Sequence, residues 1–122
     1  MTFSTQTLLQ TVVNGIAFQN YDGSTDNFAT DPLAAANFYG GQGSVQTAII
    51  TVTNFTGIIT LQASLNKDSK TASWFDVEIY DTTARPVASE TTSYTMTGNF
   101  VWIRAAVSQF STGIINSITV SY

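Results

Sequence analysis

Cysteine and histidine are both absent from this sequence of 122 residues. Their absence excludes disulfide bonds, zinc sites built from thiolates or imidazoles, and the Ser-His-Asp and Cys-His systems of nucleophilic catalysis. Without histidine, the chain also lacks the side chain that most often transfers protons near neutral pH. Catalysis by this chain would therefore have to rely on carboxylates.

Basic residues are scarce as well. Only four are present, against eight acidic residues, and the net charge is −4. So few positive charges cannot neutralise a phosphate backbone, and we expect no nucleic acid partner. No basic residue precedes the first apolar run, and no apolar run reaches the roughly 20 residues that a membrane helix needs. We therefore expect no signal peptide, no transmembrane segment and synthesis in a cytoplasm.

The residues that are abundant favour strands over helices. Threonine, serine and β-branched residues are frequent, whereas proline occurs only twice. No segment has the helical apolar period, and short alternating segments are separated by turn residues, which is typical of a sandwich or barrel. The predicted fold is an all-β antiparallel sandwich, jelly-roll-like, with about eight strands in a single domain over residues 1–122. Residues 41–122 would form the sandwich core, and residues 1–40 its first strands or an inter-subunit arm.

Three turn signals predict β-hairpins. Phe100 to Tyr122 alternates on both sides of Ser111-Thr112-Gly113, so we expect two strands joined by a turn there. A similar phrase, Val52 to Ile59, predicts a second hairpin turning at Thr56-Gly57. Asn14-Gly15 between apolar runs predicts a third, because both residues tolerate positive φ. The two similar phrases indicate two sheets, or two halves of one sheet, that face each other.

Two groups of acidic residues are the candidates for chemistry. Asp76 and Glu78 would share one face of a strand, as the paired carboxylates of a glycosidase might, opposite Phe75, Val77 and Ile79. We favour the simpler interpretation that they form a solvated face. Asp22, Asp26 and Asp31 lie in a polar loop that could surround calcium, but they lack the EF-hand spacing, and turn formation accounts for them better. We therefore expect no enzyme, no cofactor and no metal.

Aromatic residues are the candidates for binding. Trp74, Trp102, Tyr80 and Tyr94 are the side chains on which a sugar could stack. Trp102 would lie on the outer face of its strand beside Arg104, where the amino-terminal segment or another subunit would cover it. We favour such packing over sugar binding. If residues 1–40 formed an arm, its anchors would be Phe18, Tyr21, Phe28, Phe38 and Tyr39, although a role as first strands is favoured.

Five segments together resemble a known kind of protein. They are Phe38-Tyr39-Gly40-Gly41, Phe55-Thr56-Gly57, Leu61 to Leu65, Trp74-Phe75-Asp76-Val77 and Asn99 to Arg104. Over roughly residues 38–122 the chain resembles the small β-sandwich structural proteins of tailed bacteriophage virions, of the T4-like marine cyanophage type. None of the five segments is a catalytic signature.

The resemblance implies a non-enzymatic virion component, either a capsid decoration protein or part of the tail, neck or baseplate. It would be assembled in the host cytoplasm as a symmetric homo-oligomer and would act through contacts with other virion proteins. The candidate interface residues are Trp74, Trp102, Arg104, Phe38, Tyr39, Tyr21 and Phe28. The alternative is a carbohydrate-binding β-sandwich module for adhesion to a host surface, with Trp74, Trp102 or Tyr80 as its stacking platform.

Overall fold

The computed structural model describes residues 5–35, 45–68, 70, 73–85 and 87–122. These residues form eight strands that belong to one antiparallel sheet. The all-β class and the expected number of strands are therefore confirmed. The strands are β1 (Thr5–Leu9), β2 (Val12–Val13), β3 (Phe28–Ala29), β4 (Leu33–Ala34), β5 (Val45–Ser64), β6 (Phe75–Asp81), β7 (Ser89–Thr97) and β8 (Trp102–Ser121).

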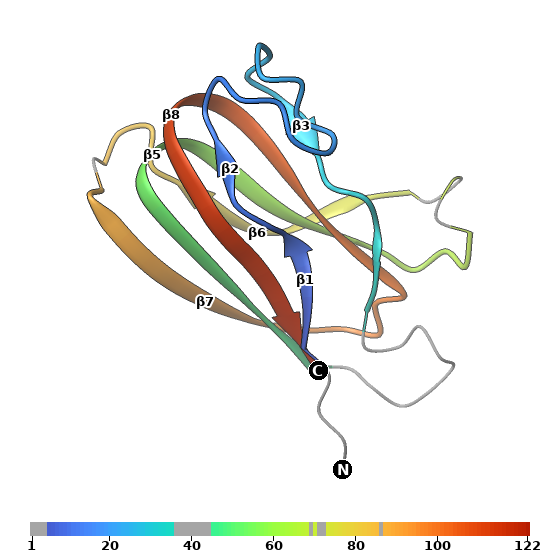
Figure 1. Ribbon diagram of the computed structural model, residues 1–122. Coiled ribbons are helices and arrows are strands. Elements are labelled where there is room, and N and C mark those ends of the chain that lie inside the picture. Colours follow the sequence, from blue (N-terminus) through green and yellow to red (C-terminus); the bar gives the residue numbers. More distant parts are fainter. Residues whose placement is uncertain (1–4, 36–44, 69, 71–72, 86) are drawn as a thin grey trace.

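Two strands of 20 residues each, β5 and β8, form the centre of the sheet and pair with each other along their length. The other edge of β5 pairs with β7 in its first half and with β6 in its second half. The other edge of β8 pairs with β3 and β4 in its first half and with β2 and β1 in its second half. Both long strands bend over at the same end of the molecule (Figure 1), so one sheet folds into the two layers of a sandwich.

The two hairpins predicted at the repeated phrase are wrong. Residues 102–121 form one strand, and so do residues 45–64. In a hairpin the two halves of each segment would pair with each other, but here each half pairs with the opposite long strand. The sequence signal does mark a change of direction, because both strands bend at these places (Figure 1).

The bends arise from bulges at residues with positive φ. Asn54 and Gln109, which occupy matching places in the repeated phrase, have φ of 50° and 52°, and Gly113 has φ of 95°. The register between β5 and β8 shifts at three places between Thr51 and Ile58. Each bulge inserts a residue, bends its strand and changes which side chains point inward. The strands therefore turn a corner without ending.

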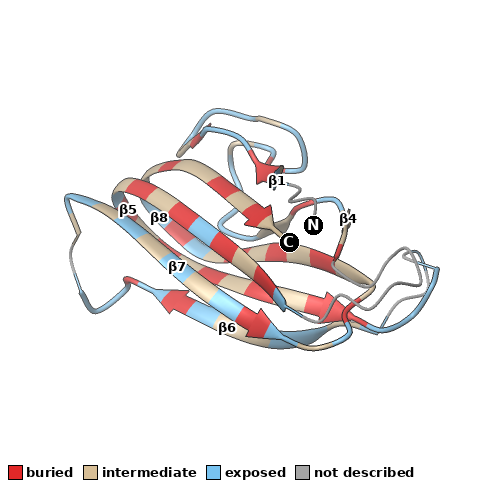
Figure 2. Ribbon diagram, turned by 90° about the horizontal axis from the view of Figure 1, so that it is seen from below, coloured by how far each residue is buried: buried red, intermediate tan, exposed pale blue. Residues whose placement is uncertain are grey.

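The change of inward-facing side chains keeps one continuous core inside the bend. In β5 the buried residues are the even-numbered ones from Gln46 to Val52, the odd-numbered ones from Phe55 to Ala63, and Ser64 at the end of the strand. In β8 they are the odd-numbered ones from Ile103 to Val107, followed by Phe110. After the bend the buried residues are Ile115, Ile118 and Val120. Figure 2 shows buried residues alternating with more exposed ones along these strands.

Aromatic rings fill the core at the bend. Phe55 and Phe110, one from each copy of the phrase, have ring centroids 5.5 Å apart. The ring of Tyr21 lies 5.4 Å from Phe110 and 5.1 Å from Phe28. Aromatic pairs at such separations add stability beyond the area that they bury. The repeated phrase is therefore the place where the two long strands and the amino-terminal segment meet.

The amino-terminal segment supplies strands of the same sheet. Its described strands, β1 to β4, all pair with β8 of the same chain, as first strands of the sheet would. Asn14-Gly15 does form a turn, with Ile16 donating a hydrogen bond to the Val13 carbonyl over 3.1 Å. No hairpin follows, because β2 pairs with β8, and only an isolated bridge joins Phe18 and Tyr21.

Candidate functional site

The second half of β5 and its neighbours present a group of planar side chains on the outer surface of their layer. Gln62 of β5 lies opposite Asp76 of β6 on one side and opposite Arg104 of β8 on the other. Directly opposed residues in antiparallel strands share a face, so these three side chains form a row across three strands. Trp102 precedes Arg104 by two residues in regular register with Ser64, which places it on the same face. We call this group, with Trp74, the tryptophan face.

Hydrogen bonds connect the row in one direction. Arg104 donates from Nε to Oε1 of Gln62 over 2.8 Å, and Gln62 donates from Nε2 to Oδ1 of Asp76 over 2.9 Å. The Gln62 amide is thus held between a cation that donates and an anion that accepts, and these two partners determine its orientation. The row is therefore a preformed polar ladder across three strands.

Both tryptophans of the face lie near Arg104, Trp74 in direct contact and Trp102 two residues before it in β8. The guanidinium carbon of Arg104 is 4.4 Å from the centre of the Trp74 ring, a cation–π contact. The indole N–H of Trp102 donates to the Lys67 carbonyl over 3.0 Å, which attaches the loop after β5 to this face. Partial burial lowers the pKa of Arg104 below its ordinary value, yet a guanidinium keeps its charge in a protein. Both indoles are half-buried.

The predicted interface residues fall into three groups in the structure. Trp74, Trp102 and Arg104 come together in the tryptophan face. Tyr21 is only 2% exposed and belongs to the core, whereas Phe28 is partly buried and packs with Tyr21 against Phe110. Phe38 and Tyr39 lie outside the described residues.

Two members of the face were not predicted as binding residues. The sequence pattern does not indicate Gln62 as a binding residue, and it indicates Asp76 only as a possible partner of Glu78. The signal that links them to Arg104 is their cross-strand register, which depends on a bulge in β6 that shifts the pairing between Leu61 and Gln62. Register between strands distant in sequence is set by tertiary pairing, so the alternation within each strand could not show it.

The same bulge separates Asp76 from Glu78. Glu78 pairs with Leu61 and Asp76 with Gln62, and consecutive residues of a strand point to opposite faces. The prediction that the two carboxylates share a face is therefore wrong, and so is the grouping of Phe75, Val77 and Ile79 as the buried side. Phe75 and Ile79 are 41% and 57% exposed, and Tyr80 is the buried residue of β6.

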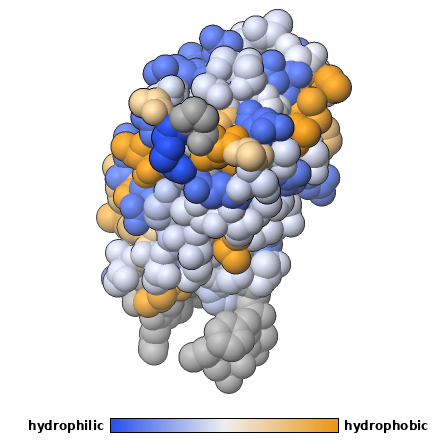
Figure 3. Space-filling view, turned by 90° about the vertical axis from the view of Figure 1, so that its left-hand side faces the viewer, coloured by the Kyte–Doolittle hydropathy of each residue, from blue (hydrophilic) through white to orange (hydrophobic). Residues whose placement is uncertain are grey.

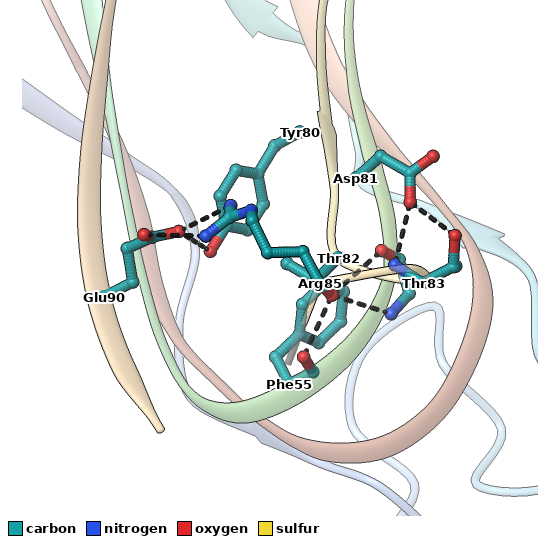
Figure 4. Close-up of polar contacts among 8 residues, drawn as sticks. Phe55, Tyr80, Asp81, Thr82, Thr83, Arg85 and Glu90 are labelled. Carbon is teal, nitrogen blue, oxygen red and sulfur yellow. Dashed lines mark hydrogen bonds and ion pairs between the residues drawn. The ribbon is translucent and has the colours of Figure 1, made fainter. Parts of the chain in front are cut away.

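Tyr80 belongs to a clamp between the layers (Figure 4), and not to a stacking platform. Its ring is 3% exposed and stacks on Phe55, while its hydroxyl donates to Oε1 of Glu90 on β7 over 2.6 Å. Arg85 donates two hydrogen bonds to the same carboxylate, over 2.9 and 3.0 Å. Burial, followed by the hydrogen bond to Glu90, raises the pKa of Tyr80. The hydrogen bonds from Arg85, followed by the one from Tyr80, lower the pKa of Glu90. The clamp connects β6 to β7 across the bend.

A buried threonine completes this clamp from below. Thr82 donates to the Phe55 carbonyl over 2.9 Å and accepts from the Gly57 N–H over 3.1 Å (Figure 4). It thereby satisfies backbone groups of β5 just after the bulge at Asn54, where the regular ladder is interrupted. Next to it, Asp81 accepts two hydrogen bonds from Thr83, which lower the pKa of Asp81. This region is structural.

The acidic loop before β3 forms turns. Oδ1 of Asp22 accepts from the backbone N–H groups of Ser24 and Thr25, both over 2.8 Å, and these bonds lower the pKa of Asp22 to about 2. Asp31 accepts from the Asn20 amide over 3.0 Å. Among the described residues, acidic side chains nowhere gather in a group that could hold a metal ion. The loop thus shows the turn chemistry that was favoured over a calcium site.

The described part of the chain contains no helix long and apolar enough to cross a membrane.

Comparisons with known proteins find likeness only among solved structures. No family model matches the chain, and no curated protein does. One structural neighbour is the K3 cleaved adhesin domain of Lys-gingipain from Porphyromonas gingivalis W83, with a TM-score of 0.49 and 8% identity, over 91% of this chain and 69% of that one. Another is a family 29 carbohydrate-binding module from Piromyces equi, with a TM-score of 0.47 and 14% identity, over 98% and 91% of the two chains. At TM-scores below 0.5, neither neighbour indicates what this chain binds.

Proposed function

We propose that this chain is a non-catalytic carbohydrate-binding domain whose ligand lies across the tryptophan face. The observation that carries the proposal is that Trp74 and Trp102 lie beside the ladder formed by Asp76, Gln62 and Arg104. The Trp74 ring lies against the guanidinium, and Trp102 lies two residues before Arg104 on the same face of β8. The ladder is held by two hydrogen bonds below 3 Å, so its geometry exists before any ligand arrives. Preorganised polar groups reduce the entropy lost on binding.

The chemistry of the face matches that of a sugar. A pyranose ring has flat sides of C–H groups, which pack on the electron-rich face of an indole, and a rim of hydroxyl groups that both donate and accept. Arg104 offers donors and Asp76 offers acceptor oxygens at two ends of one row. A flat sheet face with such side chains accommodates an extended saccharide more readily than a compact molecule, which needs a concave pocket.

The described residues give no support to catalysis at this face. Asp76 and Glu78, the carboxylates considered for glycoside hydrolysis, lie on opposite sides of β6. Asp76 is exposed and accepts a hydrogen bond from Gln62, so it is paired with an amide and not with the second carboxylate that glycoside hydrolysis uses. We therefore assign binding and not turnover to the site.

The test is a glycan array followed by titration calorimetry on the best ligand. Trp74→Ala is expected to weaken binding at least about tenfold, because it removes the stacking surface and the support of Arg104. Circular dichroism and thermal melting establish that the variant is folded, and Trp74→Phe, which keeps an aromatic face, is expected to retain part of the affinity.

Phe75→Ala is the matched control, because Phe75 is the next aromatic residue and contacts Phe100, with ring centroids 5.8 Å apart. It should leave the affinity unchanged. If the unmodified protein binds no glycan on the array, or if Phe75→Ala weakens binding as much as Trp74→Ala, the proposal fails.

A second candidate function is assembly with other virion proteins, which the resemblance in sequence implies. The observation that favours it is the edge strand β7, whose nine residues pair with β5 without a bulge and with no other strand in the described chain. It has no lysine, arginine or proline, the residues that usually protect an edge from pairing with another chain. The face on this side is a mixture of hydrophobic and hydrophilic residues (Figure 3), so backbone pairing would be the main attraction.

If the chain assembles through β7, analytical ultracentrifugation should show self-association that rises with concentration. Thr95→Lys should reduce this association, because Thr95 is exposed and a lysine on an edge strand discourages pairing with another chain. It also predicts that mass spectrometry of purified virions detects this chain. A protein that stays monomeric and is absent from virions would contradict this function while leaving carbohydrate binding untouched.

A further inference from the structure

The two arginines of the chain have different partners. Arg85 forms a two-bonded pair with the carboxylate of Glu90, the only ion pair among the described residues. Arg104 forms no ion pair with a carboxylate of the described residues. Its Nε bonds to an amide oxygen and its guanidinium lies against Trp74, while neither of its Nη atoms has a hydrogen-bond partner within the described chain.

Those two terminal nitrogens are open to solvent and not trapped. No described buried side-chain nitrogen or oxygen lacks a hydrogen-bond partner, so the unpartnered Nη atoms of Arg104 are accessible. Contacts at Nε and on the ring of Trp74 hold the guanidinium in place. What remains is the edge with two parallel N–H groups, the geometry that binds a carboxylate or sulfate through two hydrogen bonds.

The Nη edge of Arg104 carries a positive charge at the surface of a protein whose net charge is negative. The net charge of the chain is −4, but the loop attached to the face through the Lys67 carbonyl contains one more lysine than acid, because Lys67 and Lys70 flank Asp68. The nearest acid in the row, Asp76, is two strands away from Arg104 and already accepts a hydrogen bond from Gln62. An anion bound at the Nη edge would therefore lie closer to the guanidinium of Arg104 than to the carboxylate of Asp76.

From this geometry we propose that the tryptophan face selects an acidic saccharide, with the carboxylate of a uronic acid bound by the Nη groups of Arg104 and the adjoining sugar ring packed on an indole. The inference rests on the proposed carbohydrate function and adds the class of ligand. A neutral sugar would leave the charge of Arg104 without a counter-ion, whereas a uronate would supply one and form two charge-assisted hydrogen bonds.

The experiment measures binding of the full chain to four polysaccharides by affinity electrophoresis and calorimetry. They are polygalacturonate, the same polymer fully methyl-esterified, dextran sulfate and a neutral β-glucan. The expected order places polygalacturonate first, with at least about tenfold weaker binding to the methyl ester, because esterification removes the charge and one acceptor. Stronger binding to dextran sulfate would overturn the assignment of a carboxylate in favour of a sulfate ester.

Substitutions of arginine identify the group responsible. Arg104→Gln should weaken binding to polygalacturonate about ten- to a hundredfold, and Arg104→Lys should fall between, because an ammonium group cannot form the two parallel bonds. Arg85→Gln removes the same charge at the opposite end of β6 and should leave affinity unchanged. Equal losses in both glutamine variants would show a general charge effect and overturn the inference.

The outcomes also distinguish a failure of the acidic-saccharide inference from a failure of the proposed carbohydrate-binding function. If the protein binds the neutral glucan and the methyl ester as tightly as polygalacturonate, carbohydrate binding stands and the acidic class is wrong. If it binds none of the four polysaccharides and no glycan on the array, both fail.

Discussion

Phe55→Ala is expected to lower the free energy of unfolding by about 3–5 kcal/mol, the usual cost of removing a fully buried phenylalanine. The ring is 0% exposed and lies between Tyr80, with centroids 6.4 Å apart, and Phe110, at 5.5 Å. It therefore supports both layers at the bend. Because a domain of this size is stable by only about 5–15 kcal/mol, the variant should be close to unfolding at 37 °C. Urea denaturation followed by circular dichroism measures the change.

Two further variants make the Phe55 result specific. Phe75→Ala removes the same atoms from a ring that is 41% exposed and should cost clearly less. A double-mutant cycle with Phe110→Ala should give a coupling of about 0.5–1.5 kcal/mol, since the two rings are in contact. Equal costs for Phe55→Ala and Phe75→Ala, or strict additivity of Phe55→Ala and Phe110→Ala, would contradict the packing of the bend.

Gly113→Ala is expected to cost at least about 3 kcal/mol or to prevent folding, through two effects that add. Gly113 has φ of +95°, which an alanine adopts only at a cost of roughly 1–2 kcal/mol. A Cβ there would also overlap the Asn54 carbonyl oxygen and lie 2.5 Å from the carbonyl carbon. These atoms are backbone atoms of β5, so the clash is relieved only by separating the two central strands.

Gly15→Ala is the matched control for Gly113→Ala. Gly15 has a similar φ of +90°, but a Cβ there would have no atom within 4 Å. Its cost should therefore be that of the backbone conformation alone, roughly 1–2 kcal/mol. Thermal melting and urea denaturation of both variants isolate the steric part. If Gly113→Ala were no more destabilising than Gly15→Ala, the close contact between β8 and β5 at the bend would be wrong.

The repeated phrase shows how a correct local signal led to an incorrect element. Both copies contain residues that adopt positive φ, and both copies do change the direction of the chain. A turn and a bulge use the same residues, and they differ in whether the flanking segments pair with each other or with a third segment. That choice is made by the partner strand, whose paired residues at the phrase lie more than 40 positions away in the sequence.

The sequence predicts only part of the tryptophan face, because the rest of it also depends on pairing between distant strands. Trp102 and Arg104 share a strand, so their alternation placed them on one outer face correctly. Gln62 and Asp76 joined them only through cross-strand register, and Tyr80 was excluded only by its burial and its bond to Glu90. Asp76 is therefore not paired with Glu78 but belongs to a ladder with the Gln62 amide and the Arg104 guanidinium.

By itself, the sequence determined that the chain is an antiparallel β protein without thiolate or imidazole chemistry, because composition and the period of two are local properties. It also determined the places at which the long segments change direction. Only the tertiary structure decided that these segments remain single strands, that the sheet folds on itself and that Trp74 meets Arg104. The reason is that a bulge changes which face of a strand is buried, and its effect becomes visible only when the neighbouring strand is in place.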